Sequence, residues 1–174
     1  ISPDHMDAGY NRPLLVLNLE DFKTGWPTYE YCWKKSKLDS APTVTRRPKW
    51  RLCDQGRVLV WGEQGIGDEV MFASLIRDLH TVCSHLIVKA DLCLIPILRR
   101  SFPRGIEFYA NGETVPEDDY DAHIAMGPLP MHFRSNINSF KIAAQGYLLA
   151  DTAKAAALRD QLLSDGSETL IGIS

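Results

Sequence analysis

Three carboxylates and three glycines lie close together within residues 62–69, and this is the part of the chain best suited to chemistry. Asp68 follows Gly67 directly, at the start of a predicted helix. A carboxylate in that position can accept a proton from a hydroxyl or hold a sugar hydroxyl, and the helix dipole keeps it ionised at neutral pH. Asp68 is therefore the candidate general base. The alternative is that Asp68 serves only as a cap for the helix.

The same stretch resembles the beginning of a dinucleotide-binding fingerprint, because one residue separates Gly65 from Gly67. Val70 occupies the position of the third glycine, however, and carboxylates at a helix start repel a pyrophosphate. A dinucleotide-dependent enzyme would also need Asp91, 26 residues after Gly65, to hold a ribose. This class of function is therefore disfavoured.

His123 is a second candidate, in a predicted strand over residues 122–126 that ends just before Gly127. It alternates with Ala125, so the two side chains share one face of the strand. We expect His123 to lie at the same sheet edge as Asp68, where it could donate a hydrogen bond to a substrate. The alternative is a core histidine whose hydrogen bonds are satisfied within the protein.

Signatures of several other enzyme classes are missing from the sequence. It contains no HExxH, GxSxG, P-loop or kinase motif, so metalloproteases, serine hydrolases and nucleoside triphosphatases have no support. Asp119-Tyr-Asp121 spells a metal-binding Asp-x-Asp motif, but it lies in a polar loop before a strand. We therefore predict neither a metal ion nor a cofactor.

A predicted strand, loop and helix position the carboxylates. Residues 58–61 are a short apolar run whose length and β-branched content suit a strand buried on both faces. After a loop with glycines, a helix is predicted from Asp68 to His80, because its apolar residues recur at helical spacing. These elements form the first half of a βαβ unit, where α/β folds place their ligands.

Three further strands are predicted, over residues 85–90, 106–110 and 122–126. Between the first two of them, a helix is predicted over residues 91–101, although Pro96 must distort or delay it. Alternating strands and helices of this size predict an α/β fold with a parallel, doubly wound, Rossmann-like sheet.

Two helices are predicted before the sheet. The first covers residues 5–20, where Pro13 kinks the helix or delays its start. In the second, four aromatic residues spaced four, three and four apart form one stripe: Phe22, Trp26, Tyr29 and Trp33. Two antiparallel helices would bury this stripe, and packing explains it better than an aromatic ligand site.

The predicted sheet is bordered by a linker and by a C-terminal helix. Residues 35–56 mix basic residues with proline and show no periodicity, which is typical of a linker or a wrapping loop. Asp151 caps a predicted helix over residues 152–163. A last strand is predicted over residues 169–173, and a strand at that position leads us to expect a following domain.

Composition limits the class of protein. The chain has 174 residues, 45% of them hydrophobic and 24% charged, as in a soluble globular protein. A net charge of -3 favours neither nucleic acid nor an anionic membrane as partner, and no apolar run reaches the roughly 20 residues of a membrane helix. The four cysteines form no CxxC pair. They predict free thiols in a reducing compartment, and thus a cytoplasmic protein.

Five motifs are spread over nearly the whole chain. They are residues 21–30 with Trp33, residues 48–50, Trp61-Gly-Glu-Gln-Gly-Ile-Gly-Asp68, residues 127–130 and residues 146–148. Together they resemble bacterial tetratricopeptide-repeat proteins that carry a C-terminal glycosyltransferase-like region. The run from Trp61 to Asp68 is the most specific. The region is similar to the GT-B fold of heptosyltransferases and O-linked N-acetylglucosamine transferases, in which two Rossmann-like domains face each other across a cleft.

This resemblance implies four segments. Residues 1–35 would be a tetratricopeptide-like helical hairpin and residues 36–55 a linker. Residues 56–168 would be the Rossmann-like N-terminal domain of a GT-B fold, on the side of the acceptor. Residues 169–174 would be the first strand of a second domain, which normally holds the nucleotide-sugar.

The resemblance also implies a function, a glycosyltransferase that moves a sugar from a nucleotide-sugar to a protein or glycan hydroxyl. Asp68 would be the base, and the substrate would contact Glu63, Gln64, Gly65, Ile66, Gly67, His123 and Gly127. The helical hairpin would offer a surface to a protein partner, and an inverting GT-B transfer needs no metal. The alternative is a non-catalytic interaction module in which the same elements serve as a scaffold.

Overall fold

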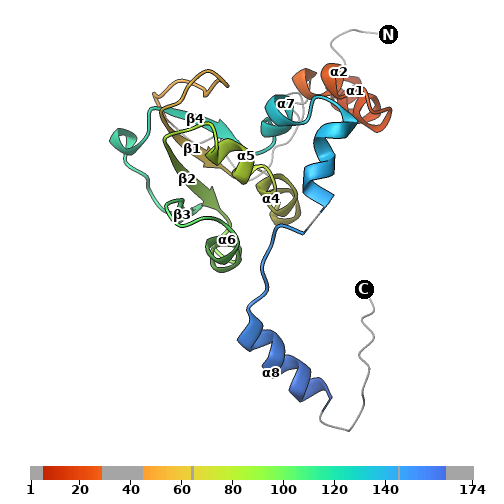
Figure 1. The fold of residues 1–174 in the computed structure, drawn as a ribbon. Coiled ribbons are helices and arrows are strands. Elements are labelled where there is room, and N and C mark those ends of the chain that lie inside the picture. Colours follow the sequence, from red (N-terminus) through yellow and green to blue (C-terminus); the bar gives the residue numbers. More distant parts are fainter. Residues whose placement is uncertain (1–5, 29–44, 64, 145, 164–174) are drawn as a thin grey trace.

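The computed structural model describes residues 6–28, 45–63, 65–144 and 146–163, and its centre is a four-stranded sheet (Figure 1). All strand pairs are parallel, and the strand order is β3-β2-β1-β4. The strands are β1 (Arg57–Trp61), β2 (His85–Ala90), β3 (Glu107–Ala110) and β4 (Ala122–Ala125). Each lies within one residue of its predicted limits, and the expected α/β, Rossmann-like sheet is confirmed.

One face of the sheet packs against helices. The connection from β1 to β2 contains α4 (Ile66–Ala73) and α5 (Ile76–His80), and the connection from β2 to β3 contains α6 (Ile95–Ser101). Side chains that alternate along the strands meet these helices in the main hydrophobic core, among them Val58, Val60, Leu86, Val88, Phe72, Ile76, Leu79 and Leu98. Pro96 lies in the first turn of α6, so the helix starts later than residue 91, as expected from the missing backbone donor.

The other face has a smaller core of Leu59, Trp61, Ile87, Val115, Tyr120 and Ala125. The connection from β3 to β4 covers it with a single 3-10 turn, η1 (Glu117–Asp119). A doubly wound sheet would place helices on this face as well, and within the described ranges that expectation is wrong. The physical reason is length, because the few residues between Ala110 and Ala122 can cross the sheet but cannot also form a helix.

The predicted helix from Asp68 to His80 differs from the structure in two ways. Helix α4 already begins at Ile66, so Gly67 lies in its first turn and not in the loop. The helix then breaks between α4 and α5, where the Ser74 hydroxyl donates to the main-chain oxygen of Met71 at 2.7 Å. The Tyr147 hydroxyl donates to the oxygen of Val70. Side-chain hydroxyls thus satisfy carbonyls near the break that a continuous helix would bond internally.

The helical pair α1 (Met6–Asn18) and α2 (Phe22–Thr28) precedes the sheet, with Pro13 inside α1. Helix α2 contacts α7 (Leu129–Phe133), and the three helices lie side by side (Figure 1). The indole of Trp26 donates to the main-chain oxygen of Arg134 at 2.8 Å, beyond the end of α7. Of the predicted aromatic stripe, Phe22 and Trp26 stack with ring centroids 6.3 Å apart, whereas Tyr29 and Trp33 lie outside the described residues.

Two further described helical segments follow α7 along the chain. A 3-10 stretch, η2 (Ile137–Ala144), follows α7. Helix α8 (Thr152–Leu162) stands apart in Figure 1, its side chains are exposed, and Asp151 caps it by accepting from the amide of Lys154 at 3.0 Å, as predicted. The strand expected over residues 169–173 lies outside the described residues. Among the helices that are described, none is long and apolar enough to cross a membrane.

Residues 45–56 lie along the edge of the sheet beside β4. Lys49 forms an isolated parallel bridge with His123, through hydrogen bonds from the Trp50 amide to His123 oxygen (2.8 Å) and from the His123 amide to Pro48 oxygen (3.0 Å). The described part of the predicted linker therefore wraps the outer edge of β4.

Candidate functional site

Asp68 is the third residue of α4, at the edge of the sheet where the parallel strands end, and its side chain is partly exposed. Gly65 is the N-cap and offers no side-chain cap. Within the described ranges, the Asp68 carboxylate makes no hydrogen bond or ion pair, so the capping alternative finds no contact to support it. A carboxylate at a helix start with its oxygens uncommitted can accept a hydrogen bond or a proton from a ligand.

The first turn of α4 leaves space around Asp68. Gly65 and Gly67 are exposed, and a Cβ built on Gly67 would have no heavy atom within 4 Å. A Cβ on Gly65 would lie 3.8 Å from Oδ2 of Asp68. Ile66 is 48% exposed. Gln64, the remaining residue of the predicted loop, lies outside the described residues. Among the described residues, this turn is therefore open to a ligand.

Glu63 and Gly127, both predicted to contact substrate, lie together. Glu63 is only 5% exposed, and its Oε1 accepts from the Gly127 amide at 2.7 Å while Oε2 accepts from the Met126 amide at 3.1 Å. These bonds join the end of β1 to the end of β4. Through these two hydrogen bonds Glu63 holds two strand ends together at the edge that carries Asp68.

Glu69 is a buried carboxylate that the sequence analysis did not single out. It is 3% exposed, and its Oε2 accepts from the Asp91 amide at 2.6 Å while Oε1 accepts from Nδ2 of Asn111 at 3.0 Å. Asp91 follows β2 and Asn111 follows β3. A methyl group on Gly62 would overlap the Glu69 carboxylate, so glycine at that position makes room for it.

Burial raises the pKa of Glu69, and the hydrogen bonds from Asp91 and Asn111 oppose that rise. One signal in the sequence could have identified this residue. Glu69 precedes Phe72, Ala73 and Ile76 by three, four and seven residues, which is the spacing of one helical face. All four side chains are buried. A carboxylate on the buried stripe of a helix requires partners, and the strand ends supply them.

His123 does not lie beside Asp68. It pairs with Leu59 in the sheet register, two residues before the end of β1, and it is on the face that the helices do not cover. Its Nδ1 accepts from Nε1 of Trp61 at 3.3 Å, and the two rings stack with centroids 6.5 Å apart. Burial lowers the pKa of His123, and the charge of Lys49 adds to the effect. His123 thus lies within the sheet opposite Leu59, where its observed side-chain hydrogen bond is with Trp61, and its contact with a substrate stays a prediction.

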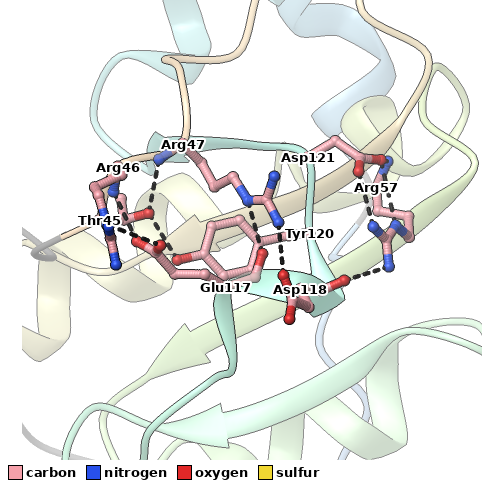
Figure 2. A network of polar contacts seen from close by, with 8 residues as sticks. All are labelled: Thr45, Arg46, Arg47, Arg57, Glu117, Asp118, Tyr120 and Asp121. Carbon is pink, nitrogen blue, oxygen red and sulfur yellow. Dashed lines mark hydrogen bonds and ion pairs between the residues drawn. The ribbon is translucent and has the colours of Figure 1, made fainter.

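The opposite edge of the sheet, where the strands begin, carries a network of ion pairs (Figure 2). Arg57 donates from Nη2 to Oδ1 of Asp121 at 2.8 Å and from its amide to Oδ2 at 2.9 Å. These hydrogen bonds hold the pKa of Asp121 at about 2. Arg47 bonds Asp118 at 3.1 Å in the same network and so ties the wrapping segment to η1. Asp121 of the Asp119-Tyr-Asp121 motif is therefore engaged by arginine.

A shallow cavity of about 300 Å³ also lies at that edge, lined by Pro48, Asp54, Gly56, Arg57, Val58, Asp121 and Ala122. It is separate from the turn that carries Asp68, because Val58 and Ala122 are early residues of their strands. Across the residues that the structure describes, no cluster of three or more His, Cys, Asp or Glu side chains is arranged to hold a metal ion.

These observations define a class, an α/β protein with a four-stranded, all-parallel, Rossmann-like sheet preceded by a helical pair. No protein-family model matches the chain, and no solved structure matches it. The chain is similar to Protein FlbA of Caulobacter vibrioides, with 25% identity over 182 residues. The match covers 94% of this chain but 30% of FlbA, so the chain spans about a third of the length of that relative.

Proposed function

We propose that this chain is the acceptor side of a glycosyltransferase that moves a sugar from a nucleotide-sugar to a hydroxyl of a protein or glycan. One observation carries the proposal. Asp68 has an uncommitted, partly exposed carboxylate in the first turn of α4, directly after the central strand β1. In parallel α/β sheets, the edge where the strands end is where ligands bind.

In this reaction the acceptor domain supplies the general base and the surface beneath the acceptor. Asp68 accepts the proton of the acceptor hydroxyl while that oxygen forms a bond to the anomeric carbon of the sugar. The bond from the anomeric carbon to the nucleotide phosphate breaks, and the phosphate leaves with the electron pair. Asp68 ends the step protonated and returns its proton to solvent. Gly65, Ile66 and Gly67 would lie beneath the acceptor, where a side chain larger than hydrogen on either glycine would narrow the approach.

The rest of the proposal follows the resemblance to GT-B enzymes. Residues 56–168 form the acceptor domain, and residues 169–174 begin a second Rossmann-like domain that holds the nucleotide-sugar. Residues 1–35 form a helical hairpin that receives a protein partner, and residues 36–55 connect the two. The similarity to FlbA supports a bacterial setting, and the reaction takes place in the cytoplasm, where nucleotide-sugars are made.

The test titrates a panel of nucleotide-sugars against the 174-residue chain and against the longest natural form of the protein, and then measures transfer. We expect binding and transfer with the longest form, and loss of transfer but not of donor binding in Asp68→Asn. Asp160→Asn, on the exposed helix α8, is the matched control. Absence of donor binding in every form would refute the transferase.

A non-catalytic interaction module is the second candidate, and exposed apolar residues within α1 and directly after it favour this alternative. Leu14, Leu15 and Leu19 are 42%, 63% and 78% exposed. Exposed apolar side chains that cluster on one element often mark a protein interface. On this alternative, Leu15→Ser with Leu19→Ser abolishes a protein interaction, whereas Asp68→Asn has no effect on any measured property.

A further inference from the structure

Helix α4 depends on contacts outside itself for its position. It has eight residues, fewer than an isolated helix needs for stability in water. Its N-cap, Gly65, has no side chain that could fix the first turn. The buried carboxylate of Glu69 joins that turn to the sheet, through the Asp91 amide and the Asn111 side chain. The first turn is thus held from β2 and β3, the two strands that follow it in the chain.

The position of Glu69 also determines the direction in which the Asp68 side chain points. Successive residues of an α-helix project about 100° apart, since there are 3.6 residues per turn. With Glu69 turned inwards to the strand ends, Asp68 is turned towards the open side of the edge, where it is partly exposed. A rotation of the first turn would move both side chains together. The contacts of the buried Glu69 carboxylate therefore fix the direction of the partly exposed Asp68 carboxylate.

We propose that Glu69 is a positioning residue for Asp68, holding the first turn of α4 against the ends of β2 and β3 so that the Asp68 carboxylate faces the candidate acceptor site. What Asp68 does there rests on the proposed function, whereas its position does not. Asn111 contributes to the same positioning, because its amide supplies one of the two hydrogen bonds to Glu69.

The amide of Asn111 makes a conservative replacement possible. Glutamine at position 69 can accept from the Asp91 amide with its oxygen, but its NH2 group would meet the NH2 group of Asn111. If the Asn111 amide turns over, its oxygen faces the new donor and both hydrogen bonds are restored. Glu69→Gln should therefore keep α4 in place, whereas Glu69→Ala loses both bonds.

The experiment reads the position of Asp68 without requiring turnover. Carbon-detected NMR at a fixed pH reads the carboxyl shift of Asp68 in the intact chain, together with hydrogen exchange of the Glu69 amide, which bonds Gly65 oxygen at 3.0 Å. Glu69→Ala should change the Asp68 carboxyl shift and speed the exchange of the Glu69 amide by at least about tenfold, because the first turn frays. Glu69→Gln should stay close to wild type. Should Glu69→Ala not fold, Asn111→Ala, which removes one bond, should give a smaller change in the same direction.

Glu113→Gln is the matched control, because Glu113 accepts from the Ala110 amide at the end of β3 but bonds no residue of α4 in the described structure. It should leave the Asp68 carboxyl shift and the exchange of the Glu69 amide unchanged. Wild-type behaviour of Asp68 in both Glu69→Ala and Asn111→Ala would overturn the proposal, and so would an equal change in Glu113→Gln. Where transfer is measurable, Asn111→Ala should lower kcat with the KM of the nucleotide-sugar unchanged. Failure to find any transfer refutes the proposed function and leaves the NMR result to decide the positioning.

Discussion

The indole of Trp61 donates a hydrogen bond from Nε1 to Nδ1 of His123, and the 3.3 Å contact joins β1 to β4 on the face that carries no helix among the described residues. The bond requires an unprotonated Nδ1. His123 is half-buried beside Lys49, and burial is the main reason that its pKa is lowered from 6.5. Protonation of this ring would break the bond and place a charge in a partly apolar site.

Folding stability should therefore fall as the pH drops below about 6.5. With the folded pKa of His123 lowered, the unfolded chain binds more protons in this range, so acid favours unfolding. Above that pH both states are neutral at this site, and no dependence on His123 is expected. Urea unfolding at pH 7.5 and 5.5 measures the loss, which His123→Asn should reduce. His132, whose pKa is also lowered by burial, should account for a further share in His132→Asn. An unchanged pH dependence in the double variant would contradict this account.

Glu63 and Glu69 should respond differently to replacement by glutamine. Glu63 accepts from two backbone amides, of Met126 and Gly127, which cannot turn over. The NH2 group of glutamine would face one of these donors, and we expect a loss of about 2–3 kcal/mol in the free energy of unfolding. Glu69→Gln should cost less than about 1 kcal/mol, since Asn111 can adapt. Denaturant titration of both variants provides the comparison, and equal losses would show that side-chain adaptation plays no part.

Tyr147 should contribute to stability through its hydroxyl, which bonds the Val70 oxygen near the break after α4. Burial raises the pKa of Tyr147 to about 12, so its ultraviolet titration should come late in the alkaline range. Tyr147→Phe leaves a partly buried carbonyl without its donor and should cost roughly 1–2 kcal/mol. Tyr109→Phe is the control, because the Tyr109 hydroxyl bonds the exposed Glu107 and its loss should matter less. The reverse order of the two effects would argue against this role.

Gly62 and Gly67 should respond oppositely to alanine. At Gly62 the new methyl overlaps the Glu69 carboxylate and must displace a buried, hydrogen-bonded group. We expect Gly62→Ala to destabilise the fold strongly. At Gly67 a Cβ meets nothing within 4 Å, and alanine inside a helix is favoured over glycine by roughly 0.5–1 kcal/mol. Thermal unfolding should therefore show a lower Tm for the first variant and a higher Tm for the second. A stable Gly62→Ala would mean that Glu69 can relocate at little cost.

The strands of the sheet could be predicted from the sequence, because the signals that mark them come from residues that are neighbours in the chain. Its strands are apolar runs bounded by glycine, proline or polar residues, and the cap of Asp151 on α8 depends on neighbouring residues alone. The break after Ala73 could not be predicted, because the donor to Val70 is Tyr147, a residue far away in the chain. Within the described residues, the absence of a helix on one face was predictable in principle from the short connection between β3 and β4.

The candidate site was predictable in part. Asp68 could be placed at the end of β1 because strand, glycine loop and helix follow one another directly. His123 was expected at the same edge because it lies near the end of its strand, but its partner Trp61 comes from a neighbouring strand that its residue types do not reveal. The roles of Glu63 and Glu69 depend on which strands are neighbours in space. Partners that come from three different strand ends can be recognised only once the strand order is known.

The bridge between Lys49 and His123 protects the sheet edge against pairing with a second copy of this protein. Strand β4 is the last strand of the sheet, and without the wrapping segment its outer backbone groups would be open to another strand. Open sheet edges are templates for aggregation. The basic stretch before β1, which includes Pro48, therefore protects that edge: it supplies backbone partners at His123 together with positive charge and a proline that discourage pairing with another strand.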